Sequence, residues 1–224
     1  MGAAPRVFVV ALLAAVLGWA GFEAVRYGVT GTAAGNGARE LDRAGRLAGM
    51  QVAGSWWLAD LARAAAEVPK DPMLHELLAL AIVRGGTEVG ELGEAERQLK
   101  AAIESRAGSP YAWASLVEVK YRIGETGAAF EKALVNAASL GPHEPEVQRT
   151  VADYGLAVMD EVGPATRAAI ERAVAAGMKR NAPEILQIAA RRGRLGVACR
   201  HLDGGPRPAE SKWTQLCQSM EATS

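Results

Sequence analysis

Aromatic residues are scarce in this sequence of 224 residues, at 5%, although hydrophobic residues make up 50% of it. A β-sheet normally contains more aromatic and β-branched residues, whereas alanine, the commonest residue type here, favours closely packed helices. From Ala38 onward hardly any run alternates like a strand, and apolar residues recur instead at spacings of three and four. The sequence therefore predicts an all-α fold.

An excess of charge of either sign is also lacking, because 25 Lys and Arg residues balance 25 Asp and Glu residues. The chain as a whole gives no reason to expect a nucleic-acid partner. It also has no Walker-type phosphate loop, dinucleotide-binding glycine motif, nucleophile elbow, HExxH zinc motif or CxxCH haem site. We therefore expect a protein that is not an enzyme and that holds no metal or cofactor.

Cysteine is limited to Cys199 and Cys217. In an oxidising compartment such a pair can form a disulfide worth roughly 3 kcal/mol, but sequence does not show whether the two Cα atoms come close enough. Together with His201 the pair offers three zinc ligands, whereas a structural zinc site normally has four in recognisable pairs. The sequence leaves a disulfide and two free thiols open, and it disfavours zinc.

A single long apolar run is present, from Val7 to Phe22, and it follows a positive charge at Arg6. As a helix this run is roughly 24 Å long, and its neighbours extend it toward the ~30 Å hydrocarbon core of a bilayer. Trp19 and Tyr27 lie where an interfacial belt would fall. We predict that residues 1–27 form an uncleaved transmembrane signal anchor with the bulk of the chain outside the cytoplasm; a cleaved signal peptide and a buried soluble helix are the alternatives.

Small, uncharged residues follow this anchor in GVTGTAAGNG, residues 28–37, and predict a flexible tether. Beyond the tether we expect helical repeats over 38–178. Basic helices and a tail over 179–224 should pack on these repeats, with Trp213 holding the tail.

The same helix start occurs three times, where an acceptor side chain precedes a proline at Asp71-Pro72, Ser109-Pro110 and Glu144-Pro145. Proline suits the first helical position because it has no N–H to lose there and its φ is preset. The starts are 38 and 35 residues apart, close to the period of about 34 residues in tetratricopeptide repeats. Before each start, at a constant distance from it, there is a triplet of mostly apolar residues with spacings of four and three: Trp57, Leu61 and Ala64; Ala95, Leu99 and Ala102; Phe130, Leu134 and Ala137. The pattern predicts stacked helix hairpins.

Over about residues 38–178 the chain resembles the tetratricopeptide class in a degenerate form, since Val117 stands where that repeat has glycine and Tyr121 is one residue late. The stretches SPYAWASLVEVK, LGPHEPEVQRTVADYGLAVMDEV and AARRGRLGVAC, with the tail KWTQLC, are similar to the VpsP-type proteins of bacterial exopolysaccharide biosynthesis clusters. This second resemblance covers about 105–217. It implies a small helical protein, anchored in the bacterial inner membrane and lying in the periplasm, that assists assembly or export of a polysaccharide, and it implies no catalytic residues.

Two groups of residues are candidates for functional surfaces. The candidates for partner binding are aromatic, with packing between helices as the alternative role: Trp56, Tyr111, Trp113 and Tyr121. The candidates for anion binding follow Lys179, with Glu184 the one acid among them: Arg180, Arg191, Arg192, Arg194 and Arg200. Arginine suits bidentate contacts to carboxylate or phosphate, although cations are also common at helix C-termini, where they interact favourably with the dipole.

Our first functional hypothesis is a membrane-anchored scaffold that binds a protein partner of a polysaccharide assembly or export system. The alternative is a direct binder of an anionic glycan or lipid-linked intermediate through the arginine group. Salt-dependent binding would favour the alternative. An enzyme ranks third, because it would need a pocket that gathers His201, Arg194 and a carboxylate.

Overall fold

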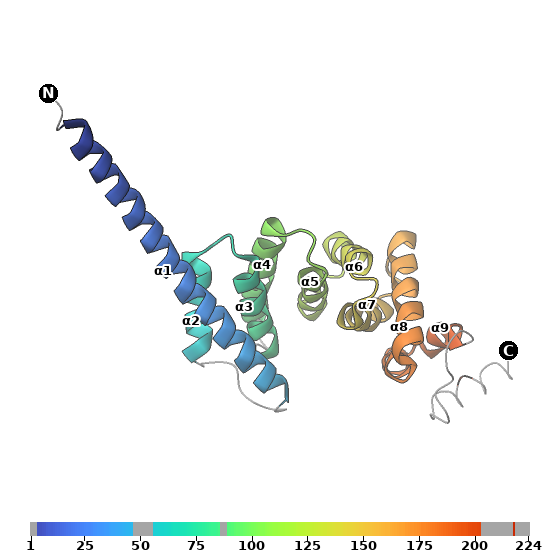
Figure 1. Ribbon diagram of the computed structural model, residues 1–224. Helices are drawn as coiled ribbons and strands as arrows, with labels where there is room; N and C mark the ends of the chain where they lie inside the picture. The colour runs from blue at the N-terminus through green and yellow to red at the C-terminus, as the bar shows by residue number, and fades with distance from the viewer. Residues whose placement is uncertain (1–3, 47–55, 86–88, 203–216, 218–224) are drawn as a thin grey trace.

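The computed structural model describes residues 4–46, 56–85, 89–202 and 217, without the side chains of 4–11, 13, 41–46 and 56. Every regular element in these ranges is a helix, so the all-α prediction is confirmed for the described part of the chain (Figure 1). In chain order the helices are α1 (Ala4–Arg46), α2 (Trp56–Glu67), α3 (Pro72–Gly85), α4 (Val89–Ser105), α5 (Pro110–Arg122), α6 (Ala128–Leu140), α7 (Pro145–Ala157), α8 (Pro164–Arg191) and α9 (Leu195–Cys199).

The three proline starts are the first residues of α3, α5 and α7, as predicted. Asp71 Oδ1 accepts a backbone N–H from the first turn of α3 at 2.9 Å, and Ser109 Oγ accepts one from α5 at 3.3 Å. Glu144, the N-cap residue of α7, makes no such bond. Its carboxylate instead accepts the Tyr111 hydroxyl at 2.5 Å, which links the beginnings of α5 and α7.

The predicted triplets form the centre of the packing between helices. They lie on α2, α4 and α6, and each of their side chains is at most 4% exposed. Consecutive helices pair, α3 with α4, α5 with α6 and α7 with α8, and these hairpins stand in a row (Figure 1). Because α5 also packs on α4 and α7, and α6 on α8, each hairpin covers the apolar side of its neighbour.

Buried polar contacts tie neighbouring hairpins together. Lys120 of α5 has a side chain that is 4% exposed, and its Nζ lies 2.9 Å from Glu96 of α4 and 2.6 Å from Glu125. Glu131 of α6 takes the place of a cap on α8, where its carboxylate accepts the backbone N–H of Gly163 at 3.0 Å. A buried ammonium group loses its hydration, so it is retained where two carboxylates compensate it.

The prediction of a flexible tether over 28–37 is wrong, because α1 runs through this segment without a break. Tertiary packing explains why small residues with low helix propensity are helical here. Thr30 is 2% exposed where α1 packs on the hairpins, and its buried hydroxyl is satisfied within α1 by the carbonyls of Arg26 and Tyr27. A Cβ at Gly37 would lie 2.5 Å from Leu61 Cδ1, so glycine permits the close approach of α1 to α2.

The first half of α1 extends away from all the other helices (Figure 1). Its large apolar side chains are exposed; Leu17, Trp19 and Phe22 retain 65–70% of their accessible surface. Part of the predicted span, including Val7 to Ala11, lies outside the described side chains. Among the described residues, no helix has enough length and apolar character to cross a membrane.

The C-terminal region departs from the predicted boundary between residues 178 and 179, since α8 continues across it. The helix changes direction instead at Asn181, with φ −146° and ψ 70°, two residues before Pro183. Cys217 is fully buried and forms a disulfide with Cys199, across a Cα–Cα distance of 5.5 Å. This answers the question that the sequence left open, whereas Trp213 lies outside the described residues.

Replacement of Gly155 by alanine should destabilise the stack. A Cβ at this position in α7 would lie 2.6 Å from Ile170 Cγ1 of α8, and Ile170 is fully buried. We expect overpacking to cost about 1–3 kcal/mol of the free energy of unfolding, more than the ~1 kcal/mol that alanine gains over glycine in a helix. Urea unfolding followed by circular dichroism measures the change.

The matched control is Gly93→Ala in α4, where no atom would lie within 4 Å of the added Cβ. This variant should be more stable than the wild type by about 0.5–1 kcal/mol. Stabilisation of the protein by both substitutions would contradict the close packing of α7 on α8.

Candidate functional site

Two tyrosines, an arginine and two carboxylates meet where α5, α7 and the end of α8 lie together. The Tyr121 and Tyr154 rings are 5.1 Å apart, and the Arg192 guanidinium lies 5.3 Å and 5.8 Å from their centroids. Arg192 Nε donates to Asp153 Oδ1 at 2.7 Å, and the Tyr154 hydroxyl donates to Glu118. We call these five residues the tyrosine–arginine cluster; their side chains are half-buried, and each retains exposed surface.

The electrostatics of the cluster disfavour ionisation of Glu118. Burial raises the pKa of this carboxyl above its usual value, with a further contribution from Asp153, although Arg122, Arg84 and the Tyr154 hydroxyl oppose the shift. The pKa of the Tyr154 phenol is raised too, by burial and by the charges of Glu118 and Asp153. Half-buried groups whose charge is disfavoured occur more often at binding surfaces than elsewhere, so this cluster is a candidate site.

The cluster unites one residue from each predicted group, Tyr121 from the aromatic set and Arg192 from the basic set. Sequence reasoning missed Glu118, Asp153 and Tyr154. A signal for two of them exists: Glu118 follows Pro110 by the same interval as Asp153 follows Pro145, so equivalent positions of consecutive helix starts carry a carboxylate.

The other aromatic candidates lie elsewhere. Tyr111 is 44% exposed at the start of α5 and holds Glu144, as described above. Trp113 is half-buried, and its Nε1 donates to the Ala107 carbonyl at 2.8 Å, so it fixes the turn before α5. Trp56 begins α2, but its side chain lies outside the described residues. The three aromatic candidates whose side chains are described therefore do not gather on one surface patch.

The other basic candidates each contact a different polar group. The guanidinium groups of Arg191, Arg194 and Arg200 pair with Asp153, Asp160 and Glu171 respectively. Arg180 donates to the His143 carbonyl at 2.8 Å. Because the partners belong to different elements, these arginines do not converge on a common anion.

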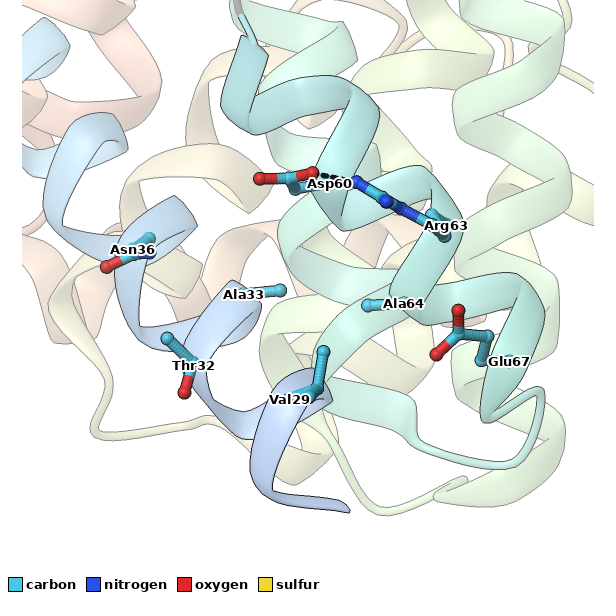
Figure 2. A pocket seen from close by; sticks show the side chains of 8 residues that line it. All are labelled: Val29, Thr32, Ala33, Asn36, Asp60, Arg63, Ala64 and Glu67. Atoms are coloured by element: carbon cyan, nitrogen blue, oxygen red, sulfur yellow. Dashed lines mark hydrogen bonds and ion pairs between the residues drawn. The ribbon is translucent and has the colours of Figure 1, made fainter. Parts of the chain in front are cut away.

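A cavity of about 290 Å³ lies between α1 and α2, and Figure 2 shows the side chains that line it. Val29, Thr32, Ala33 and Asn36 line it from α1, and Ala33 points toward Ala64 of α2 (Figure 2). Asp60 pairs with Arg63, and Glu67 adds a further carboxylate to the lining. The cavity belongs to the junction of α1 with the hairpins, and its lining has no cluster of unpaired cations.

One histidine packs between the hairpin helices and the turn before α3. His75 is buried, with Nδ1 2.5 Å from Gln98 Oε1 and Nε2 3.0 Å from the Pro69 carbonyl. No group of three or more potential metal ligands occurs among the described residues.

Comparison of the chain with known protein families, curated proteins and solved structures finds no match.

Replacement of Glu118 by glutamine should raise stability at neutral pH but not in acid. Because the pKa of Glu118 is raised in the folded state, the wild type loses stability relative to Glu118→Gln as pH rises through that pKa. Below the unfolded pKa, near 4.5, the carboxyl is protonated in both states and the difference should vanish. Urea unfolding at pH values of about 4 and 7 tests this prediction.

The comparison variant is Glu96→Gln, whose effect should have the opposite sign. Burial opposes the charge of Glu96, but the ammonium groups of Lys100 and Lys120 outweigh it and lower the pKa of this carboxyl. The wild type therefore gains stability relative to Glu96→Gln as pH rises from acid to neutral. The same sign for both variants would contradict the electrostatic account.

Proposed function

We propose that this protein is a non-enzymatic, membrane-attached scaffold whose helix hairpins bind a protein partner. The observation that carries the proposal is the division of α1 into two halves. One half extends alone with exposed apolar side chains, and the other packs into the hairpins. A soluble protein rarely exposes a continuous apolar surface of this kind, whereas a helix that enters a bilayer needs one.

We assign the membrane attachment to the amino-terminal half of α1, because its exposed surface is apolar. Leu17 is 70% exposed, Trp19 67% and Phe22 65%, so the helical surface is apolar on several sides. The apolar stretch ends near an ion pair between Glu23 and Arg26, 2.6 Å apart, at the depth where polar groups return. Arg6 precedes the stretch, which favours a cytoplasmic amino-terminal side and hairpins in the periplasm. The Cys199–Cys217 disulfide also supports an oxidising compartment.

The carboxy-terminal half of α1 fixes the hairpins to this anchor. Ala34 packs in one cluster with Leu61 of α2 and Leu74 of α3. Arg26 Nη1 also donates to the Glu67 carbonyl at the end of α2, at 3.4 Å. Since α1 is a single helix, the row of hairpins holds a set orientation relative to the membrane, which suits a scaffold.

The partner is proposed from the sequence resemblance together with the surface chemistry. The tyrosine–arginine cluster offers aromatic and charged groups from three helices, the mixture that is typical of energetically important positions in protein interfaces. Following the resemblance to the VpsP-type and tetratricopeptide classes, we propose a partner from an exopolysaccharide assembly or export system at the bacterial inner membrane. Direct binding of an anionic glycan by the arginines ranks second, because four of the five already pair with Asp153, Asp160 or Glu171.

Two aspartates introduced side by side in the exposed half of α1 should release the protein from membranes. Aspartate at a bilayer centre costs about 2.5–3.5 kcal/mol, so Val16→Asp with Leu17→Asp should move most of the protein into the soluble fraction after carbonate extraction. The matched control places Asp at Met73 and Val89, which are 56% and 69% exposed on the hairpins. This control should stay with the membrane, and equal release of both variants would contradict the anchor.

A photo-reactive residue at Arg192 or Tyr111 should crosslink to a discrete protein in native membranes, because both side chains belong to surfaces proposed for the partner. The control position is Lys132, an exposed residue of α6. Mass spectrometry of the adducts should identify the same protein from Arg192 and Tyr111 and not from Lys132. Adducts with glycan or lipid alone, confined to Arg192, would overturn the scaffold in favour of a ligand holder.

A further inference from the structure

A basic cavity lies where the turn between α6 and α7 meets the first part of α8. Two adjoining hollows of about 220 Å³ and 560 Å³ share His143, Gln148, Arg172 and Ala176 as lining residues. Small residues create the space, since Ala138, Gly141, Ala173 and Ala176 all line the smaller hollow. The smaller volume is below the range of roughly 300–1,000 Å³ that is usual for drug-sized ligands. A single ring-sized molecule therefore suits it.

The charge of this cavity differs from that of the arginine pairs further along the chain. Among its lining residues, Arg172, Lys179 and Arg180 are cationic, and none is a carboxylate. In the described part of the chain, Arg172 and Lys179 have no hydrogen-bond or ion-pair partner, whereas Arg192 and Arg194 are each paired with an aspartate. The cavity thus has a local excess of positive charge that an anion would neutralise.

Gln148 supplies a second, independent sign of a ligand. Its side chain is 3% exposed, and its Nε2 donates to the Pro142 carbonyl at 2.5 Å. That bond fixes the orientation of the Gln148 amide. If the amide were reversed, Oε1 would lie against the Pro142 carbonyl oxygen, and neither atom could donate a proton. The Oε1 atom is buried and has no hydrogen-bond partner among the described residues, although its residue lines both hollows. Such an acceptor costs free energy as long as it lacks a donor, and a ligand hydroxyl that reaches it recovers this cost.

We propose that the basic cavity binds a hydroxylated anion the size of one sugar ring. Its anionic group contacts Arg172 and Lys179, and one of its hydroxyl groups donates to Gln148 Oε1. The positive charge of the cavity repels a cation. A neutral sugar does not neutralise that charge, and an anion without hydroxyl groups provides no donor for Gln148 Oε1. A sugar acid and a sugar phosphate share this chemistry. The proposal is independent of the scaffold function, because neither α1 nor the tyrosine–arginine cluster contributes to the cavity.

Isothermal titration calorimetry on the full chain in detergent micelles tests the ligand class. The probes are glucuronate, glucose 1-phosphate, glucose and cyclohexanecarboxylate. We expect glucuronate or glucose 1-phosphate to bind. The probe with the higher affinity shows whether the natural ligand has a carboxylate or a phosphate as its anionic group. Glucose and cyclohexanecarboxylate should bind at least about tenfold more weakly, as loss of one charge-assisted or buried hydrogen bond implies. Binding of glucose as tight as that of glucuronate, or no binding of either anion, would overturn the proposal.

Variants assign the binding to this cavity. Lys179→Gln should weaken anion binding by about fivefold or more, whereas Lys132→Gln, the same change at an exposed lysine of α6, should alter it less than about twofold. Gln148→Leu should remove the preference for glucuronate over cyclohexanecarboxylate. If Gln148→Leu does not fold, Ala176→Met, at a half-buried position that fills the cavity, should abolish binding of the anion. Unchanged affinity in both Lys179→Gln and Ala176→Met would overturn the assignment.

Discussion

No helix hairpin of this protein can bury its own apolar face, and the structure depends on each neighbour covering it. The contact surface between hairpins combines large and small residues, as in Phe130, Leu134 and Ala137 of α6, which are all fully buried. Small residues let helices approach, and large ones fill the remaining space. This constraint makes the protein a row of hairpins in which a substitution such as Gly155→Ala acts on the contact between α7 and α8.

Polar groups in such a row either join hairpins or remain available to ligands. Lys120 with Glu96, and Glu131 with the start of α8, join one hairpin to the next. The tyrosine–arginine cluster also spans helices, but burial disfavours the charge of Glu118. The basic cavity has unpaired cations and a buried acceptor on Gln148. These two places therefore retain unfavourable free energy that a bound partner or ligand can relieve.

The sequence predicted the hairpins well because their signals are local. A capping side chain before Pro72 or Pro110 acts within one helical turn, and the triplet around Leu99 reflects burial that recurs once per hairpin. The helical state of 28–37 could not be predicted, because contacts of Gly37 and Thr30 with distant or adjacent turns override their low propensity. The site was predicted only in part for the same reason. Tyr121 and Arg192 are 71 residues apart, and no spacing rule relates them.

The measurement that tests the central claim most directly is the distance between spin labels on the two sides of residues 28–37. Double electron–electron resonance with labels at Val16 and Arg63, in lipid nanodiscs, reports whether α1 couples the membrane half rigidly to α2. The native cysteines are paired with each other, so labels attach at the introduced sites. A continuous α1 predicts one narrow distance distribution. A broad distribution would show that residues 28–37 act as a flexible linker, and it would contradict a scaffold held in a fixed orientation.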